Sequence, residues 1–107
     1  MQDNESNESP KWDVALASLI RDEYSKKGKP LKIENFNNLA TVHSIRFDDI
    51  METVFKLCVH GEWCYQNIDG KEQKINSEDV EKLYVNARLY EKDVREFTGG
   101  WCPDIIG

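Results

Sequence analysis

The stretch from residue 45 to residue 63 constrains the fold more than any other part of this chain. Its apolar residues recur at helical spacing along one face, and they are Ile50, Met51, Val54, Phe55, Leu57 and Cys58. Asp48 and Asp49 stand where the start of a helix favours carboxylates. His60 and Gly61 stand where a helix ends, because glycine readily takes the left-handed conformation. We therefore expect a helix over residues 46–60, against which the rest of the chain packs.

Two further helices are expected before this central one. The first covers residues 11–27, and its apolar stripe consists of Trp12, Ala15, Leu16, Leu19, Ile20 and Tyr24. Gly28 and Pro30 end it. Residues 31–33 are long enough only for a strand stub. The second helix opens at Glu34 or Asn35 and runs to about His43, and a turn at Ser44-Ile45 leads into the central helix.

The pattern after Gly61 changes from helical to extended. Trp63 and Tyr65 alternate with polar residues, and Asp69-Gly70 is a strong signal for a two-residue hairpin turn, after which residues 71–75 form the second strand. Asn76 then begins a capping sequence for a fourth helix. The apolar residues of this helix are Val80, Leu83, Tyr84 and Ala87, and those of a further short helical segment are Leu89, Val94 and Phe97.

These elements predict a mostly α fold with a small β-hairpin, in the order helix, strand stub, helix, helix, hairpin, helix. The 107 residues suffice for a single domain with a modest core, which we place at residues 11–98. Residues 1–10 are polar and acidic, and we expect a disordered tail there. Residues 99–107 follow the Gly99-Gly100 helix end and form a C-terminal segment that can dock on the body.

The composition restricts the classes of partner and the compartment. The formal net charge of −6 disfavours nonspecific binding to nucleic acid or to an anionic membrane. No apolar run approaches the length of a membrane span. Three cysteines, an odd number, fit reduced thiols better than a disulfide framework. We therefore expect a cytoplasmic protein without a membrane segment.

The order of elements resembles the winged-helix superfamily, a helix-turn-helix followed by a β-hairpin wing. The resemblance rests on the stub at residues 31–33, the Ser44-Ile45 turn, the helix ending at His60-Gly61 and the Asp69-Gly70 wing tip. It is a resemblance of architecture, and fold alone does not fix function. Many winged helices lay the third helix in the major groove of DNA.

The central helix departs from that DNA-binding pattern. Residues 45–62 contain four acids and two bases, so this helix would bring negative charge to phosphates. A DNA-binding regulator that uses helix 46–60 and the wing at 63–75 therefore stays the alternative. Its candidate nucleic-acid contacts are Arg46, Lys26, Lys27, Lys29, Lys32 and Lys71.

No catalytic, metal or cofactor motif emerges from the sequence. Cys58, His60 and Cys64 are close along the chain, and Cys102 can return to them, but their spacing does not match the paired cysteines of structural zinc sites. Asp48-Asp49 and Glu78-Asp79 are explained by helix starts. We therefore expect no catalytic residues, no metal and no cofactor.

The remaining hypothesis is a small acidic, non-catalytic module that binds an unknown protein partner. The candidate partner contacts are Asp48, Asp49, Glu52 and Trp101. For Trp101 two interpretations stay open, packing on the body or standing in a partner groove, because tryptophan is enriched at interface hot spots. The protein is expected to be a monomer or a homodimer, and the candidate dimer contacts are Tyr84, Val85 and Leu89.

Overall fold

The computed structural model describes residues 13–84, 88–89 and 91–104. Some of the sequence predictions concern residues outside these ranges, namely the expected tail at residues 1–10, Trp12 on the first helix, Val85 and Ala87. Within them the fold is mostly α-helical with a small antiparallel sheet, which confirms the expected fold class. In this part of the chain no helix is both long enough and apolar enough to cross a bilayer.

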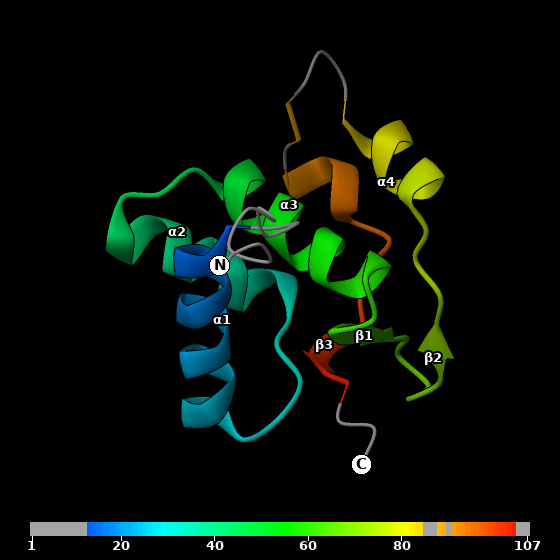
Figure 1. The fold of residues 1–107 in the computed structure, drawn as a ribbon, viewed down its shortest axis with the longest axis horizontal. Helices are drawn as coiled ribbons and strands as arrows, with labels where there is room; N and C mark the ends of the chain where they lie inside the picture. The colour runs from blue at the N-terminus through cyan, green and yellow to red at the C-terminus, as the bar shows by residue number, and fades with distance from the viewer. Residues whose placement is uncertain (1–12, 85–87, 90, 105–107) are drawn as a thin grey trace, which may run out of the picture.

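Helices and strands follow the expected order, with one addition (Figure 1). The helices are α1 at Val14–Lys27, α2 at Ile33–His43, α3 at Phe47–Val59 and α4 at Ser77–Leu83. A short 3-10 helix, η2, covers Glu91–Val94. The strands are β1 at Trp63–Gln66, β2 at Glu72–Gln73 and β3 at Gly100–Pro103. The third strand, β3, is the addition that the sequence did not predict.

Helix α3 lies at the centre of the molecule, as expected from its apolar face. It contacts α1, α2, α4 and β1 (Figure 1). Its buried residues are Asp48, Ile50, Met51, Thr53, Val54, Phe55 and Leu57. Because α3 is covered on so many sides, only a narrow stripe of it reaches solvent.

Gly28 and Asn76 fix helix ends as the sequence predicts, and Asp13, which the sequence analysis did not select, fixes a third. The Asp13 carboxylate accepts a hydrogen bond of 3.0 Å from the Leu16 N–H and begins α1. Gly28 ends α1 at a φ of 70°, with its N–H bonded to the Tyr24 carbonyl at 2.8 Å. The Asn76 side chain accepts from the Asp79 N–H at 2.9 Å and begins α4. Local chemistry therefore sets these boundaries.

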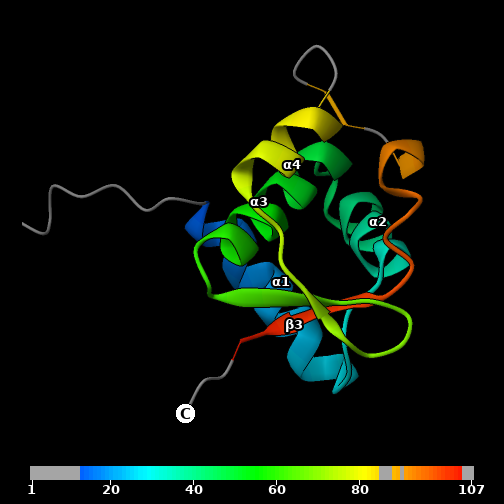
Figure 2. The same cartoon turned by 90° about the vertical axis from the view of Figure 1, so that its right-hand side faces the viewer.

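The sheet has the strand order β2-β1-β3, and both pairings are antiparallel. Figure 2 shows β1 and β3 running side by side beneath α3 and α4. The hairpin between β1 and β2 is confirmed, but its loop is longer than the two residues expected. The Asn67 side-chain oxygen accepts from the N–H groups of Asp69 and Lys71 at 2.9 and 3.0 Å, and this organises the wider loop.

The described part of the C-terminal segment docks on the body of the domain, which is the possibility that the sequence left open. Strand β3 pairs with β1 along its whole length, and Trp101 also exchanges two backbone hydrogen bonds of 2.8 Å with Leu31. The expected strand stub at residues 31–33 is therefore a single bridge to β3. The sequence missed this pairing because both partners are too short to show a strand period.

Candidate functional site

Asp48, expected to contact a partner, is buried instead. Its side chain is 4% exposed and lies between two arginines. Arg46 donates to it twice, at 3.2 and 3.1 Å, and Arg88 donates at 2.6 Å from forty residues further along the chain. Two guanidinium groups thus occupy the carboxylate that a partner would need. Asp48 therefore joins α3 to the segment after α4, and its role as a partner contact is wrong.

The two arginines also determine how Asp48 titrates. Burial alone would raise the pKa of this carboxyl, but the hydrogen bonds and positive charges of Arg46 and Arg88 outweigh burial and hold the pKa below 3.8. A lowered pKa in the folded state means that the ionised form stabilises the fold above this pH. The stabilisation is lost as the pH falls through the lowered value.

Asp48→Asn is expected to lower the free energy of unfolding by about 2 kcal/mol at neutral pH, because charged hydrogen bonds become neutral ones. The difference from the wild type should shrink as the pH falls through the lowered pKa of Asp48, where the wild-type carboxyl also loses its charge. Urea unfolding at several pH values measures both effects. Asp22→Asn on the exposed face of α1 is the control. A difference that does not change with pH would contradict the ion-pair explanation.

Trp101 is also placed in the interior, which corrects its assignment as a partner contact. Its side chain is 0% exposed, and its ring lies 4.7 Å from that of Tyr65 and 5.5 Å from that of Phe36, centre to centre. Of the two interpretations left open by the sequence, packing on the body is therefore the one observed. The β3 strand carries this side chain into the core.

The candidate dimer contacts are likewise turned inward where the structure describes them. Leu89 is 1% exposed, and the Tyr84 hydroxyl donates to the Asp48 carbonyl at 3.1 Å. Burial, followed by the nearby carboxylates, raises the pKa of Tyr84. Val85 lies outside the described residues. Leu89 is therefore buried and Tyr84 half-buried, and a homodimer through them stays a prediction.

The exposed stripe of α3 carries the two remaining acidic candidates, Asp49 and Glu52. Asp49 lies 4.0 Å from Arg46, and Glu52 forms a 3.0 Å ion pair with Lys56. These cations neutralise much of the negative charge that Asp49 and Glu52 could offer to a partner. Asp49 and Glu52 are accessible, and their role as partner contacts stays a prediction.

Three of the lysines proposed as nucleic-acid contacts gather at one concave surface. Lys27, Lys29 and Lys32 line a pocket of about 420 Å³ between the α1–α2 connection and the loop after β1. A second pocket of about 580 Å³ shares Lys32, Glu34, Thr98 and Gly99 with the first, and it adds Arg95 from beyond η2. We call these two adjoining pockets the basic trough. Four cationic side chains line it against the single carboxylate of Glu34.

Two features of the basic trough go beyond its charge. Ile68, at the tip of the hairpin, lines the trough and is 76% exposed. The N-terminus of α2, at Ile33, also opens into it and adds the positive end of a helix dipole. The trough therefore combines cations with accessible apolar surface, of which Ile68 is the most exposed part.

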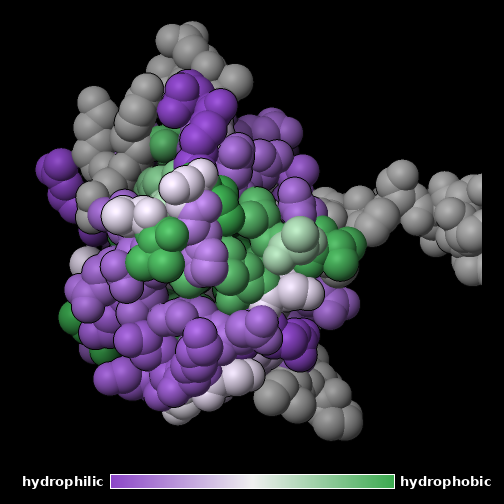
Figure 3. Space-filling model, turned by 90° about the vertical axis from the view of Figure 1, so that its left-hand side faces the viewer, coloured by the Kyte–Doolittle hydropathy of each residue, from purple (hydrophilic) through white to green (hydrophobic). Residues whose placement is uncertain are grey.

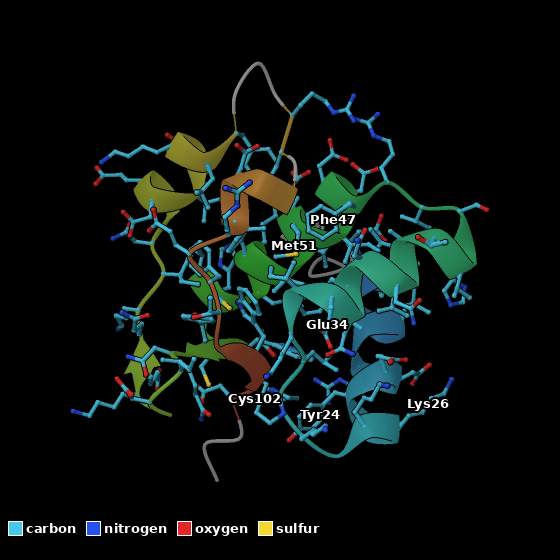
Figure 4. All side chains as sticks on the ribbon, turned by 180° about the vertical axis from the view of Figure 1, so that it is seen from behind. Tyr24, Lys26, Glu34, Phe47, Met51 and Cys102 are labelled. Carbon is cyan, nitrogen blue, oxygen red and sulfur yellow. The ribbon has the colours of Figure 1, made fainter. Side chains whose placement is uncertain are left out.

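The other basic candidates lie elsewhere. Lys26 projects from α1 away from the body (Figure 4), and it is not among the lining residues of the trough. Arg46 is engaged with Asp48 and Asp49. Lys71 is exposed in the hairpin loop but lines neither pocket of the trough. The structure thus divides the six basic candidates, and it brings only Lys27, Lys29 and Lys32 together.

Sequence reasoning missed Arg95 and Ile68 as members of this surface. Arg95 stands alone among mixed residues, so nothing local marked it. Ile68 did carry a signal, because an isoleucine beside an Asp-Gly turn stands where polar residues are usual. Its exposure at the hairpin tip follows from that position.

A further surface feature lies on the side of α1 and α2. Figure 3 shows apolar side chains gathered in the middle of this face and surrounded by hydrophilic ones. The exposed large apolar residues of these two helices are Val14, at 54%, and Val42, at 67%. Such a face is small enough to be ordinary protein surface.

The cysteines and His60 come together only in part. The sulfur atoms of Cys64 and Cys102 are 3.5 Å apart, whereas His60 lines a pocket between α3 and α4. Burial, followed by the neighbouring Cys64 and Cys102, raises the pKa of Cys58 to about 12. Across residues 13–84, 88–89 and 91–104, no three His, Cys, Asp or Glu side chains are arranged to hold a metal ion.

The fold and the trough described above are the basis on which a function can be argued. Comparison of the chain with protein-family models, with curated proteins and with solved structures finds no match.

Proposed function

We propose that this protein is a non-catalytic interaction module whose basic trough binds a short acidic segment of a partner protein. The observation that carries the proposal is the meeting of Lys27, Lys29 and Lys32 with the exposed Ile68 around one pocket. In a chain of net charge −6, such a concentration of positive charge is a local exception. It suits a ligand with several carboxylates and one apolar side chain.

The charges of the trough are available to a ligand. Among the described residues, Lys27 forms a weak ion pair with Glu23 at 3.9 Å, and neither Lys29 nor Lys32 forms an ion pair with a described carboxylate. A partner carboxylate therefore does not have to displace a strong internal pair. Electrostatic complementarity of this kind mainly raises the association rate and selects the partner.

A peptide suits the trough better than duplex DNA does. Helix α3, which a DNA-binding winged helix would place in the major groove, has seven buried residues. Its exposed stripe carries Asp49 and Glu52, which phosphates would repel. The order of elements from α1 to β2 supports the winged-helix resemblance, and we propose an adaptor of that type with its contacts moved to the trough.

Reversal of two trough charges tests the proposal. Lys29→Glu with Lys32→Glu should weaken binding of a fluorescent probe peptide, rich in glutamate and containing one leucine, by at least about tenfold. Fluorescence anisotropy measures this affinity. Lys26→Glu is the control, because it also reverses the charge of an exposed lysine, but at a position outside the trough. We expect Ile68→Ala to weaken binding as well, without a change in unfolding free energy.

Amide chemical shifts locate the ligand and separate the alternatives. Peptide binding in the trough should shift the amide signals of Lys29, Lys32, Ile68 and Thr98. If Lys26→Glu lowered the peptide affinity as much as the double trough variant, the trough would not be the binding site. Duplex DNA at low salt is the second ligand, since low salt favours phosphate contacts. Stronger shifts with DNA than with peptide would support the regulator alternative.

We also propose a cytoplasmic location and a monomeric working state. Three free cysteines support the first, because thiols persist in reducing compartments. The inward position of Tyr84 and Leu89 supports the second. Sedimentation of the purified protein over a range of concentrations tests the working state.

A further inference from the structure

We propose that Cys64 and Cys102 are an oxidation site that closes into a disulfide between β1 and β3 when the chain meets a low-molecular-weight disulfide such as glutathione disulfide. The two residues lie directly opposite each other in the antiparallel register. Their sulfur atoms are already within 3.5 Å. Both side chains are half-exposed, so a small oxidant can reach them.

The backbone geometry of the pair suits a disulfide. Residues directly opposed in an antiparallel pair have Cα atoms about 4.5–5.5 Å apart. Disulfides span Cα separations of about 4.4–6.8 Å, with sulfur atoms about 2.0 Å apart. Only a small rotation of the two side chains therefore separates the thiol pair from the bond, and the strands keep their register.

The chemistry balances in two thiol–disulfide exchanges. One cysteine thiolate attacks glutathione disulfide, which forms a mixed disulfide and releases one glutathione. The second cysteine attacks the mixed disulfide at the protein sulfur, which forms the Cys64–Cys102 bond and releases a second glutathione. The protein thiols lose two electrons and two protons, and the two glutathione molecules gain them.

The surroundings make this exchange slow at neutral pH. Burial, followed by the hydrogen bond and charge of Cys102, raises the pKa of Cys64 to about 12, and the carboxylates of Glu72 and Asp104 act in the same direction. Cys64 therefore stays protonated and is a weak nucleophile. The Cys64–Cys102 disulfide therefore forms under sustained oxidising conditions, and the site does not act as a fast peroxide sensor.

The bond would fasten the segment that completes the core. Strand β3 carries the buried Trp101, and only Asp104 follows it among the described residues. The two cysteines are 38 residues apart, so the bond closes a long loop and restricts the unfolded chain. Oxidation should therefore raise the melting temperature of the full chain by on the order of 10 °C.

Thiol counting and peptide mapping of the full chain test the proposal. After long incubation of the reduced protein with excess glutathione disulfide at mildly alkaline pH, two of the three cysteines should resist alkylation. Mass spectrometry of proteolytic peptides should then join Cys64 to Cys102. The Cys58→Ser variant should form the same bond, whereas Cys64→Ser and Cys102→Ser should retain glutathione adducts or free thiols.

Several results would overturn the proposal. These are three alkylated cysteines at saturating oxidant, a mapped bond that includes Cys58, and a melting temperature that falls on oxidation. The mapping of the wild-type chain does not depend on any variant, so a serine variant that fails to fold leaves the test decisive. Reduction with dithiothreitol should return the original melting temperature.

Discussion

Replacing Trp101 with alanine is expected to lower the free energy of unfolding by about 3–5 kcal/mol, the usual cost of truncating a buried tryptophan. The indole is fully buried, and its ring centre lies within 6.2 Å of those of its aromatic neighbours. These neighbours are Phe36, Phe55, Tyr65 and Phe97. Because small domains are stable by only about 5–15 kcal/mol, this loss is a large share of the total stability.

Circular dichroism during urea unfolding measures this effect, and two other variants define its cause. Trp101→Phe should cost much less, since it keeps an aromatic ring between Phe36 and Tyr65. Val42→Ala removes an apolar side chain that is 67% exposed and should leave stability nearly unchanged. Equal stability of Trp101→Ala and wild type would contradict the position of β3.

Gly99→Ala is expected to destabilise the fold by about 3 kcal/mol, the upper end of the usual cost of overpacking. A Cβ atom at Gly99 would meet the Gln66 carbonyl oxygen and the Asn67 backbone, well inside contact distance. These atoms belong to the backbone of β1 and its loop, so they cannot rotate away as a side chain can. The Gly99 N–H also donates to the Tyr65 hydroxyl at 2.9 Å, and a displaced residue 99 would lose this bond.

Gly28→Ala separates steric conflict from backbone strain in the same assay. Gly28 has a φ of 70°, but a Cβ there meets nothing within 4 Å. Its cost should come only from the left-handed conformation, at about 1–2 kcal/mol. If Gly99→Ala proved no worse than Gly28→Ala, the close approach of residue 99 to β1 would be in doubt.

The helical part of this fold could be predicted from sequence because its causes are local. The periodicity of residues 50–58 predicts the buried face of α3, and His60-Gly61 predicts its end. Asn76 predicts the start of α4 through a hydrogen bond three residues away. In each case the pattern and the contact that explains it lie within one or two helical turns.

The contacts that the sequence did not predict join distant residues. Asp48 stands at a helix start, which already explains a carboxylate there, so its pairing with Arg88 left no separate pattern. From the sequence, Gly99 and Gly100 are expected to end a helix. In the structure their missing side chains let the backbone of Gly99 lie close to Gln66 and that of Gly100 close to Pro30. Of the four lysines that the sequence analysis placed in one cluster, three line the basic trough and Lys26 does not, and Arg95 and Ile68 reach it only through the fold.

The pairing of Leu31 with Trp101 has a consequence for the newly made chain on the ribosome. Helices α1, α2 and α3 can form as they emerge, because their hydrogen bonds are local. The aromatic rings of Phe36 and Phe55, however, have no tryptophan to cover them until residue 101 is synthesised. Until residue 101 is synthesised, this part of the chain is therefore a set of helices with an open apolar centre, and it is then that chaperones have the most surface to bind.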